Sequence, residues 1–458
     1  MGQSKLHKNP VGAAMKRIYE PMAYGDQPIK NCYWRGFMPD NGRLYPTVPD
    51  EISCDFAIVG AGYTGLSAAL RLAKHGADVV VIDANTPGWG ASGRNGGLVS
   101  VGGSKLSDKQ ISAEFGHEDA QAYFATERAA VEFVEGIIAA LSLEVDRHSQ
   151  GYTFAAHSKK SISSVKSYGA QYKSRYGLDC EFLDKSAMIE QGMCSEEFHG
   201  AVNLPIGFAL NPMKFILGLA DAASSAGIRI FANSAVESIE CKNGYSLRTA
   251  SGIVRTKKLL MATNGYSSDD VPNGFASRFM PVQSNIIVTR PLTDDELKAQ
   301  GWWSEQMVVD SRNLLHYFRL LPDKRMLFGL RGSVKASGQN MAKTEQIARA
   351  DFNRLFPKWL SVETSYFWSG LICMSRDLVP FAGPIKGMDG AYAAMAYHGN
   401  GVSMAPYCGA LMADMALGKQ GMLNAQLMQK QMRKFELGPL RRNLLPPAFA
   451  WYKLLDRI

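Results

Sequence analysis

Paired cysteines and long apolar runs are missing from this chain of 458 residues. Its seven cysteines are scattered and include no Cys-x-x-Cys pair, which disfavours a disulfide framework and a zinc site. No stretch of about 18 uncharged apolar residues is present, and the N-terminus lacks the apolar segment of a secretory signal. We therefore expect a cytoplasmic protein without a metal site or a membrane span.

A strong excess of charge is also missing. The 50 Lys and Arg residues against 42 Asp and Glu residues give a net charge of only +8. Basic residues gather only at 430–434 and at Arg441-Arg442, where a solvated helix face is the simplest interpretation. We expect no nucleic-acid partner, and the mild positive charge can serve solubility or attract acidic substrates.

The pattern of apolar residues predicts an α/β fold with more than one domain, because 458 residues exceed what one core usually holds. Residues 55–59 and 79–82 are short apolar runs, and residues 66–74 between them have helical spacing. Strand, helix and strand in this order form the βαβ unit of a parallel sheet. Alternating apolar and polar residues predict a second sheet with an exposed or cavity-facing side at residues 152–156, 281–290, 314–320 and 326–331.

A glycine-rich turn follows the first predicted strand, in the order Gly60-Ala61-Gly62-Tyr63-Thr64-Gly65. Its glycines permit a tight turn, the approach of a pyrophosphate to the backbone, and close packing of the next helix on the sheet. The phosphates then lie at the positive end of that helix. Asp83, followed by Ala84, ends the next strand, where a carboxylate accepts hydrogen bonds from ribose hydroxyls. The turn therefore predicts a bound adenine dinucleotide, and Asp83 disfavours a 2′-phosphate.

A second glycine-rich segment, Gly88 to Gly97, comes directly after the second predicted strand. Such a backbone cradle suits the pyrophosphate, ribityl chain and ring of FAD, whereas a purely structural loop is the alternative. We expect Arg94 and Asn95 to donate side-chain hydrogen bonds to the cofactor. The predicted FAD contacts here are Gly90, Ala91, Ser92, Arg94, Asn95, Gly96, Gly97 and Leu98.

These two segments together resemble the D-amino-acid oxidase superfamily of flavoproteins, and most of all the branch that contains γ-glutamylputrescine oxidoreductase. The resemblance covers nearly the whole chain, through Tyr33-Trp34, Asn211-Pro212, Ala262 to Tyr266, Tyr317 to Arg319, Phe328-Gly329, Trp368 to Gly370, Tyr397 to Val402, and Trp451 to Asp456. It implies FAD as the cofactor and leaves the substrate open, because other members oxidise sarcosine, glycine, pipecolate or amino acids.

The resemblance also implies further cofactor contacts. Val236 is expected to bracket the adenine, and Ala262, Thr263 and Asn264 close a strand that meets the FAD. The helix that opens at Gly399-Asn400-Gly401-Val402 is expected to point its start at the flavin pyrimidine ring, with His398 in the same loop and Gly370 nearby. The family often has Gly-His-Gly where this chain has Gly399-Asn400-Gly401.

The chemistry implied by the resemblance is hydride transfer from the carbon beside an amine nitrogen to flavin N5, followed by hydrolysis of the imine. Candidate substrates are γ-glutamylputrescine-like conjugates, N-methylated amines and imino acids, and the electron acceptor is O2 or another compound. Tyr317, Arg319 and His398 are the catalytic candidates. Arg319 could clamp a substrate carboxylate or only support the sheet, and Tyr317 and Trp368 could form an amine cage or only pack. His398 could act in catalysis or in structure.

Two further expectations concern the cofactor and the role. Cys373 lies near the flavin segments, but its spacing to Ser375 and Asp377 differs from that of cysteine-linked relatives, so we expect non-covalent FAD. The alternative to an amine oxidase or dehydrogenase is a flavin-binding subunit that serves electron relay or assembly within a larger complex.

The expected fold is α/β, a Rossmann-like FAD-binding domain interleaved with a substrate domain built on a mixed or antiparallel sheet. The FAD-binding domain is expected at residues 51–145, 191–272 and 367–420, and the substrate domain at residues 146–190 and 273–366. Residues 1–50 form an extended arm and residues 421–458 a C-terminal tail.

Overall fold

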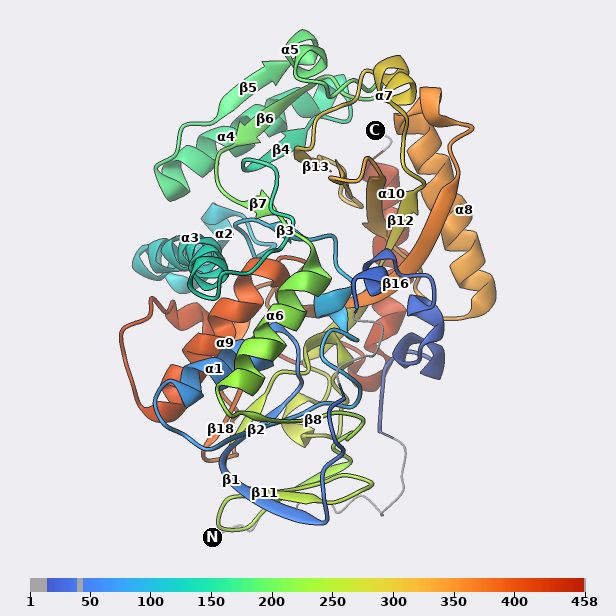
Figure 1. The fold of residues 1–458 in the computed structure, drawn as a ribbon. Helices are drawn as coiled ribbons and strands as arrows, with labels where there is room; N and C mark the ends of the chain where they lie inside the picture. The colour runs from blue at the N-terminus through green and yellow to red at the C-terminus, as the bar shows by residue number, and fades with distance from the viewer. Residues whose placement is uncertain (1–14, 39–43, 457–458) are drawn as a thin grey trace.

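Two eight-stranded sheets lie one above the other in the computed structural model, which describes residues 15–38 and 44–456 (Figure 1). The lower sheet contains β1 (Glu51–Val59), β2 (Val79–Ile82), β8 (Arg229–Phe231), β9 (Ser238–Cys241), β10 (Tyr245–Arg248), β11 (Ile253–Met261), β17 (Phe381–Pro384) and β18 (Ala391–Met395). The upper sheet contains β4 (Tyr152–Ala155), β5 (Glu181–Asp184), β6 (Gly200–Leu204), β12 (Phe279–Thr289), β13 (Met307–Asp310), β14 (His316–Leu320), β15 (Met326–Arg331) and β16 (Thr364–Ser375). A short ribbon pairs β3 (Leu98–Val99) with β7 (Phe208–Ala209). The expected α/β fold is confirmed.

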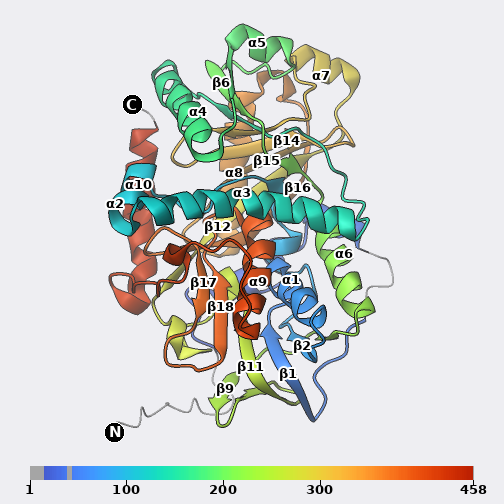
Figure 2. The same ribbon diagram turned by 90° about the vertical axis from the view of Figure 1, so that its left-hand side faces the viewer.

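Helices cover both sheets and the space between them. They are α1 (Tyr63–Ala73), α2 (Asp108–Phe115), α3 (His117–Ala140), α4 (Ile162–Tyr176), α5 (Lys185–Glu190), α6 (Pro212–Ser225), α7 (Asp294–Gln300), α8 (Gly338–Leu355), α9 (Gly401–Leu417) and α10 (Leu445–Leu455). Figure 2 shows α3 crossing the molecule between the upper strands and the pair α1 and α9. In the described part of the chain, no helix combines the length and apolar character needed to cross a membrane.

The lower sheet is parallel at its centre, as the βαβ pattern predicts. β1 lies between β11 and β2, and Val59 at its end is level with Met261 and with Ile82. Residues 56–59 and all of β2 are buried, because their side chains enter two apolar cores, one on each face of the sheet. The carboxyl ends of these strands therefore meet at one edge, where ligands of open α/β sheets bind.

The upper sheet packs its far face against α8. Phe318 of β14 and Phe328 of β15 stack with ring centroids 5.8 Å apart, and Phe352 of α8 meets Phe328 edge-on. The other face of the upper sheet is directed toward α3 and the lower sheet (Figure 2). β12 is buried along nearly all of its length, and its Ser284 and Ile286 line a cavity, which agrees with the cavity-facing side expected at residues 281–290.

Two strands belong to a different sheet from the one that the expected division gives them. β6 pairs with β4 and β5, although residues 191–272 were expected in the FAD-binding domain. β16 pairs with β12 along its whole length, although residue 367 was expected to begin the third FAD-binding segment. Alternation along a strand shows that it has two unlike faces and does not identify its partner.

The arm is folded rather than extended where the structure describes it. Short 3₁₀ helices at Pro21–Tyr24, Gln27–Ile29 and Tyr33–Phe37 lie against the body, and Asn31 bridges to Phe367 of β16. Residues 1–14 and 39–43 of the expected arm lie outside the described residues. The tail ends in α10, where Asp456 accepts hydrogen bonds from the backbone N–H and the side chain of Asn313.

Candidate active site

The glycine turn after β1 has the geometry that its sequence predicts. Gly60 has φ +111°, and a Cβ there would lie 2.7 Å from the carbonyl oxygen of Ala262. A Cβ on Gly65 would lie 1.8 Å from the carbonyl oxygen of Gly60, so α1 packs on the turn only because residue 65 has no side chain. α1 starts at Tyr63 after Gly62, which has no side chain to cap it. Its first N–H groups have no intrahelical acceptor and can bind a phosphate.

Asp83 supports this turn from the end of β2. Its Oδ2 accepts a hydrogen bond from the Ala61 N–H at 2.6 Å, and its Oδ1 accepts one from the Asn85 N–H at 2.8 Å. Burial raises the pKa of Asp83. Each oxygen keeps a free lone pair toward the pocket, which fits acceptance of hydrogen bonds from ribose hydroxyls.

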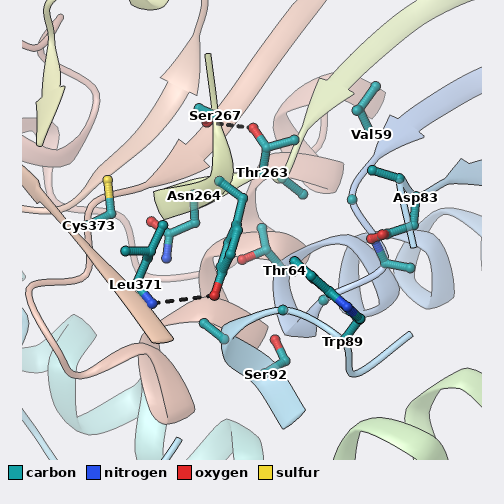
Figure 3. A pocket seen from close by; sticks show the side chains of 18 of the residues that line it. Val59, Thr64, Asp83, Trp89, Ser92, Thr263, Asn264, Ser267, Leu371 and Cys373 are labelled. Atoms are coloured by element: carbon teal, nitrogen blue, oxygen red, sulfur yellow. Dashed lines mark hydrogen bonds between the residues drawn. The ribbon is translucent and has the colours of Figure 1, made fainter. Parts of the chain in front are cut away.

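A first pocket begins at this turn and collects most of the predicted cofactor residues (Figure 3). They come from the glycine turn, the second glycine segment, the end of β11 and the start of α9. The predicted residues that line it are Gly60, Ala61, Gly62, Tyr63, Thr64, Asp83, Ala84, Gly90, Ala91, Ser92, Asn95, Val236, Ala262, Thr263, Asn264, His398, Gly399, Gly401 and Val402. Gly65 and Gly97 line neither this pocket nor the second one and serve chain packing.

Arg94 and Asn95 brace the second glycine segment instead of pointing donors at the pocket. Arg94 Nε donates to the carbonyl oxygens of Trp89 and Gly90 at 2.9 and 3.1 Å. Asn95 Nδ2 donates to those of Ala91 and Ser92 at 3.0 and 2.9 Å. The expectation that both side chains donate to the cofactor is therefore wrong, because a glycine-rich loop exposes carbonyls that need donors of their own.

The start of α9 lies where the first pocket meets a second one. Gly399, with φ +106°, and Val402 line both pockets, whereas Asn400 lines the second. Asn400 precedes the helix without capping it, because its Nδ2 donates instead to the carbonyl oxygen of Val101 at 2.9 Å. The positive end of α9 therefore faces the junction, as expected for a site that stabilises negative charge on a reduced flavin.

His398 is held on both sides by the backbone. Its Nδ1 contacts the carbonyl oxygen of Gly103 at 2.7 Å, and its Nε2 accepts from the Ser375 N–H at 3.1 Å. Burial and the nearby Lys105 lower the pKa of His398 to about 3. The ring is neutral with both nitrogens in contact with the backbone, so of the two roles considered for His398 the contacts favour the structural one, in which it fixes the loop before α9.

The second pocket is a cavity of about 520 Å³ between β12, β14 and β15 on one side and α3 and α4 on the other. The predicted residues that line this cavity and not the first pocket are Arg94, Gly96, Leu98, Gly370, Asn400 and Tyr317. Tyr317 hydroxyl lies 3.0 Å from Ser284 Oγ, so its polar end has a partner at the cavity wall. Trp368 lies outside both pockets, where its Nε1 donates to the carbonyl oxygen of Arg94, which rules it out of an amine cage.

Arg319 also lies outside both pockets, in contrast to the expected carboxylate clamp. It is fully buried, with Nη2 donating to the carbonyl oxygen of Leu210 at 2.8 Å and Nη1 to His148 Nε2 at 2.8 Å. Arg319 lies on the same face of β14 as Tyr317, two residues earlier, but its guanidinium packs against the backbone at Gly97, which lines neither pocket. Arg319 therefore supports the scaffold.

Arg331 and Lys105 supply positive charge to the cavity instead. Arg331 is at the end of β15, and a Cβ built on Gly399 would lie 3.1 Å from its Nη2, which places the guanidinium at the start of α9. Lys105 is reachable from the cavity but surrounded by protein, and burial together with Arg331 lowers its pKa to about 8. Neither side chain has an ion pair within the described residues.

Glu127 of α3 is the acidic residue that lines this cavity in the described part of the chain. Its Oε2 accepts a hydrogen bond from the Tyr176 hydroxyl at 2.6 Å. Burial raises the pKa of Glu127 to about 7. Four cations line the cavity, but Arg94 donates to backbone carbonyls and Arg175 pairs with Asp108, so Arg331 and Lys105 are left against one carboxyl group.

Sequence reasoning missed these three cavity residues and several residues of the first pocket. Trp89 and Tyr266 line that pocket with their rings 5.7 Å apart, and Arg17 and Tyr24 of the arm line it as well. Trp89 stands inside the glycine segment, so its place in the sequence was a usable signal. The arm gave no such signal, because nothing local shows which pocket a distant segment covers.

The fold and the two joined pockets define a dinucleotide-dependent oxidoreductase. The glycine turn fits a pyrophosphate, Asp83 fits a ribose, and the uncapped start of α9 fits a flavin ring. The chain belongs to the family of FAD-dependent oxidoreductases named DAO, whose family model matches residues 55–415. FAD is therefore its cofactor.

Relatives of known name match over most of the chain. The probable oxidoreductase OrdL of Rhizobium meliloti is 32% identical over 417 residues, which are 90% of this chain and 95% of that protein. The gamma-glutamylputrescine oxidoreductase of Escherichia coli is 31% identical over 375 residues, 82% of this chain and 86% of that protein.

Solved structures share the fold. Glycine oxidase from Geobacillus kaustophilus has a TM-score of 0.67 at 19% identity, over 82% of this chain and 98% of its own. Iminodiacetate oxidase from a Chelativorans species has a TM-score of 0.66 at 16% identity, over 82% of this chain and 98% of its own.

Proposed function

We propose that this protein oxidises the C–N bond of an amine that carries a carboxylate, such as an amino or imino acid. The observation that carries the proposal is that Arg331 and Lys105, unlike Arg94 and Arg175 in the same pocket, have neither an ion pair nor a side-chain hydrogen bond within the described residues. Bound FAD supplies the hydride acceptor for this reaction. The names of relatives support the same class, since they include gamma-glutamylputrescine oxidoreductase, glycine oxidase and iminodiacetate oxidase.

Arg331 is the proposed anchor for the carboxylate. A guanidinium offers two parallel N–H donors, so it fixes both the position and the orientation of a carboxylate. Because this guanidinium lies beside Gly399, an anchored amino acid has its α-carbon near the start of α9. Orientation of the reacting C–H bond is the main contribution that the protein makes to such a reaction.

The cavity contains little that could act as a strong base. In the described residues, no histidine lines it, and its one acid, Glu127, already accepts a hydrogen bond from Tyr176. Burial raises the pKa of the Tyr317 phenol, which keeps this hydroxyl neutral. These groups suit binding of the amine in its neutral form, from which hydride can leave without prior removal of a proton from carbon.

Anaerobic mixing of the FAD-loaded protein with a panel of amines tests the proposal. The panel pairs amines that carry a carboxylate, such as glycine, sarcosine, proline and iminodiacetate, with matched amines that lack one, such as methylamine and pyrrolidine. We expect bleaching of the flavin absorbance with at least one carboxylate-bearing amine and none with its matched partner. Bleaching only by amines without a carboxylate contradicts the proposed anchor.

The absence of bleaching with every amine overturns the enzymatic proposal and favours the alternative of an electron-relay subunit.

When an amine does bleach the flavin, the reoxidation of the reduced flavin distinguishes two kinds of enzyme. Recovery of the flavin absorbance in air indicates an oxidase, whereas recovery only with an artificial acceptor indicates a dehydrogenase.

A further inference from the structure

The N-terminal arm forms part of the wall of the first pocket. Met15, Arg17 and Tyr24 line this pocket together with the glycine turn and the second glycine segment. The guanidinium of Arg17 lies 4.5 Å from the ring centre of Tyr24, and its Nε is buried without a hydrogen-bond partner. Burial lowers the pKa of Arg17, which means that its charge has too little compensation in the protein alone.

The arm is fixed on both sides of Arg17. The Lys16 N–H donates to Asp270 Oδ1 at 3.0 Å, and Glu20 pairs with Arg442 at 2.8 Å. Further along, Asp26 Oδ1 accepts from Trp89 Nε1 at 2.7 Å, which joins the arm to the second glycine segment. These contacts hold the backbone of residues 16–26 in place, so the position of Arg17 at the pocket does not depend on its own side chain.

The first pocket has little other charge. Among the described residues that line it, Arg17 and Asp83 are the charged side chains, and the buried His398 is neutral. Asp83 suits hydrogen bonds from the ribose hydroxyls, and the positive start of α9 suits the flavin ring. The pyrophosphate of FAD carries two negative charges, and the glycine turn offers it only N–H groups and a helix dipole.

We propose that Arg17 binds the pyrophosphate of FAD and that residues 15–26 close over the cofactor as a clasp. A guanidinium forms charge-assisted, bidentate hydrogen bonds with phosphate oxygens, which suits a group that has no ion pair among the residues that the structure describes. The rings of Tyr24 and Tyr266, 6.4 Å apart, and of Trp89 extend the cover on the same side. FAD is thus held between the parallel sheet and a segment that precedes it in the chain.

Binding of cofactor fragments to the apoprotein tests this proposal without any activity measurement. Arg17→Ala and Arg17→Lys are compared with Lys16→Ala, which removes a neighbouring exposed cation. Dissociation constants are measured for FAD, ADP and riboflavin by titration calorimetry or flavin fluorescence. We expect Arg17→Ala to weaken FAD and ADP binding by about 10- to 100-fold, to leave riboflavin binding unchanged, and to reduce the salt dependence of ADP binding.

Arg17→Lys should retain part of the affinity, because a lysine keeps the charge without the planar pair of donors. An unchanged affinity of Arg17→Ala for ADP overturns the proposal. An equal loss of affinity for ADP and for riboflavin also overturns it, because such a loss indicates a merely structural arm. An equal loss of affinity in Lys16→Ala overturns it as well, because that result indicates a diffuse charge effect. Protection of the arm against trypsin gives an independent measure: FAD and ADP should protect Lys16 and Arg17, and riboflavin should not.

Discussion

Arg331 and Lys105 face the same cavity, and the free energy of holding two such cations together falls when an anion enters. Burial and the repulsion between the two cations lower the pKa of Lys105, and burial lowers the pKa of Arg331. At the scale of single residues, the site is therefore prepared for a negatively charged group close to the flavin ring.

Replacement of Arg331 by Met should weaken the binding of a simple carboxylate inhibitor by about 10- to 100-fold, because a charge-assisted hydrogen bond contributes about 1.5–3 kcal/mol. Titration of the flavin spectrum with acetate or benzoate measures this affinity. Arg128→Met, on the exposed side of α3, is the matched control. Equal affinities of Arg331→Met and the control would show that the anchor lies elsewhere.

Carboxylate binding should weaken as the pH rises from about 6.5 to 9. Lys105 loses its proton near its pKa of about 8, and Glu127 gains a negative charge near its pKa of about 7, so both changes act in the same direction. The same spectral titration, repeated across pH, measures the effect. Lys105→Arg should flatten the upper part of the profile and Glu127→Gln the lower part; a profile that neither variant alters contradicts this assignment.

Cys373 lines the first pocket, yet we expect FAD to be bound without a covalent link. Burial raises the pKa of the Cys373 thiol to about 12, so the nucleophilic thiolate is scarce at neutral pH. Acid precipitation should therefore release the yellow colour into the supernatant. A yellow pellet would contradict the expectation, and loss of that colour in Cys373→Ser would locate the link.

The contrast between Arg319 and Arg331 shows how far sequence reasoning reaches at this scale. Backbone roles such as those of Gly60 and Gly65 follow from the motif, because only glycine avoids the clash with the neighbouring backbone. A side-chain role depends on where the cavity ends along the strand, because Tyr317 and Arg319 share one face of β14 and only Tyr317 borders the cavity. The motif around Tyr317 contains Arg319 and not Arg331, although only Arg331 reaches the cavity.

At the scale of secondary-structure elements, a buried ion network joins β13, β14 and α8. Asp310 Oδ2 lies 2.7 Å from His316 Nδ1, and His316 Nε2 lies 3.3 Å from Asp351 of α8. Burial opposes these charges, but the partners raise the pKa of His316 to about 9 and hold that of Asp310 at about 2. The network fixes β14, which carries Tyr317 and pairs with β15, the strand that carries Arg331.

Asp310→Asn should lower the free energy of unfolding by about 3–5 kcal/mol, because it removes the nearer of the two carboxylates that pair with a buried imidazolium. Urea unfolding at pH 6.5 measures the loss. The raised pKa of His316 gives a second signature: its contribution is fully present below about pH 6.5 and is lost as the pH rises through about 9. The difference between wild type and Asp310→Asn should therefore shrink at alkaline pH, and an unchanged difference would exclude the pair as its source.

The elements differ in how well the sequence predicts them. The unit of β1, α1 and β2 follows from residues close together in the chain, and the structure confirms it. The partners of β6 and β16 could not be predicted, because alternation looks alike in either sheet. α9 is apolar on all sides and buried, so its pattern alone does not show that it starts at the cofactor.

At the scale of the whole molecule, the chain passes between the two sheets four times. It builds β1 and β2, then β4 to β6, then β8 to β11, then β12 to β16, and returns for β17 and β18. The predicted interleaving of two domains agrees with this path, although the boundaries of the individual segments remain a proposal. β16 itself connects the parts of the molecule that form the two pockets, since its Leu371 and Ile372 line both of them.

Thermal unfolding should therefore occur in one cooperative transition that FAD shifts as a whole. At an FAD concentration of about 100 times the dissociation constant, the stabilisation should reach about 2.7 kcal/mol. Circular dichroism and tryptophan fluorescence, which report on different parts of the fold, should give the same midpoint with and without FAD. Two transitions, of which FAD shifts only one, would show that the bodies unfold separately.

The position of β11 between β1 and β18 has a consequence for the making of the protein. β1 leaves the ribosome about two hundred residues before its neighbour β11 does, and β18 and α9 follow more than a hundred residues later still. The turn that carries the glycine fingerprint therefore exists without the strand that supports it until β11 has been made. Cofactor capture becomes a late event in biosynthesis, and a nascent chain stalled before about residue 250 exposes the apolar edge of β1 to chaperones rather than to flavin.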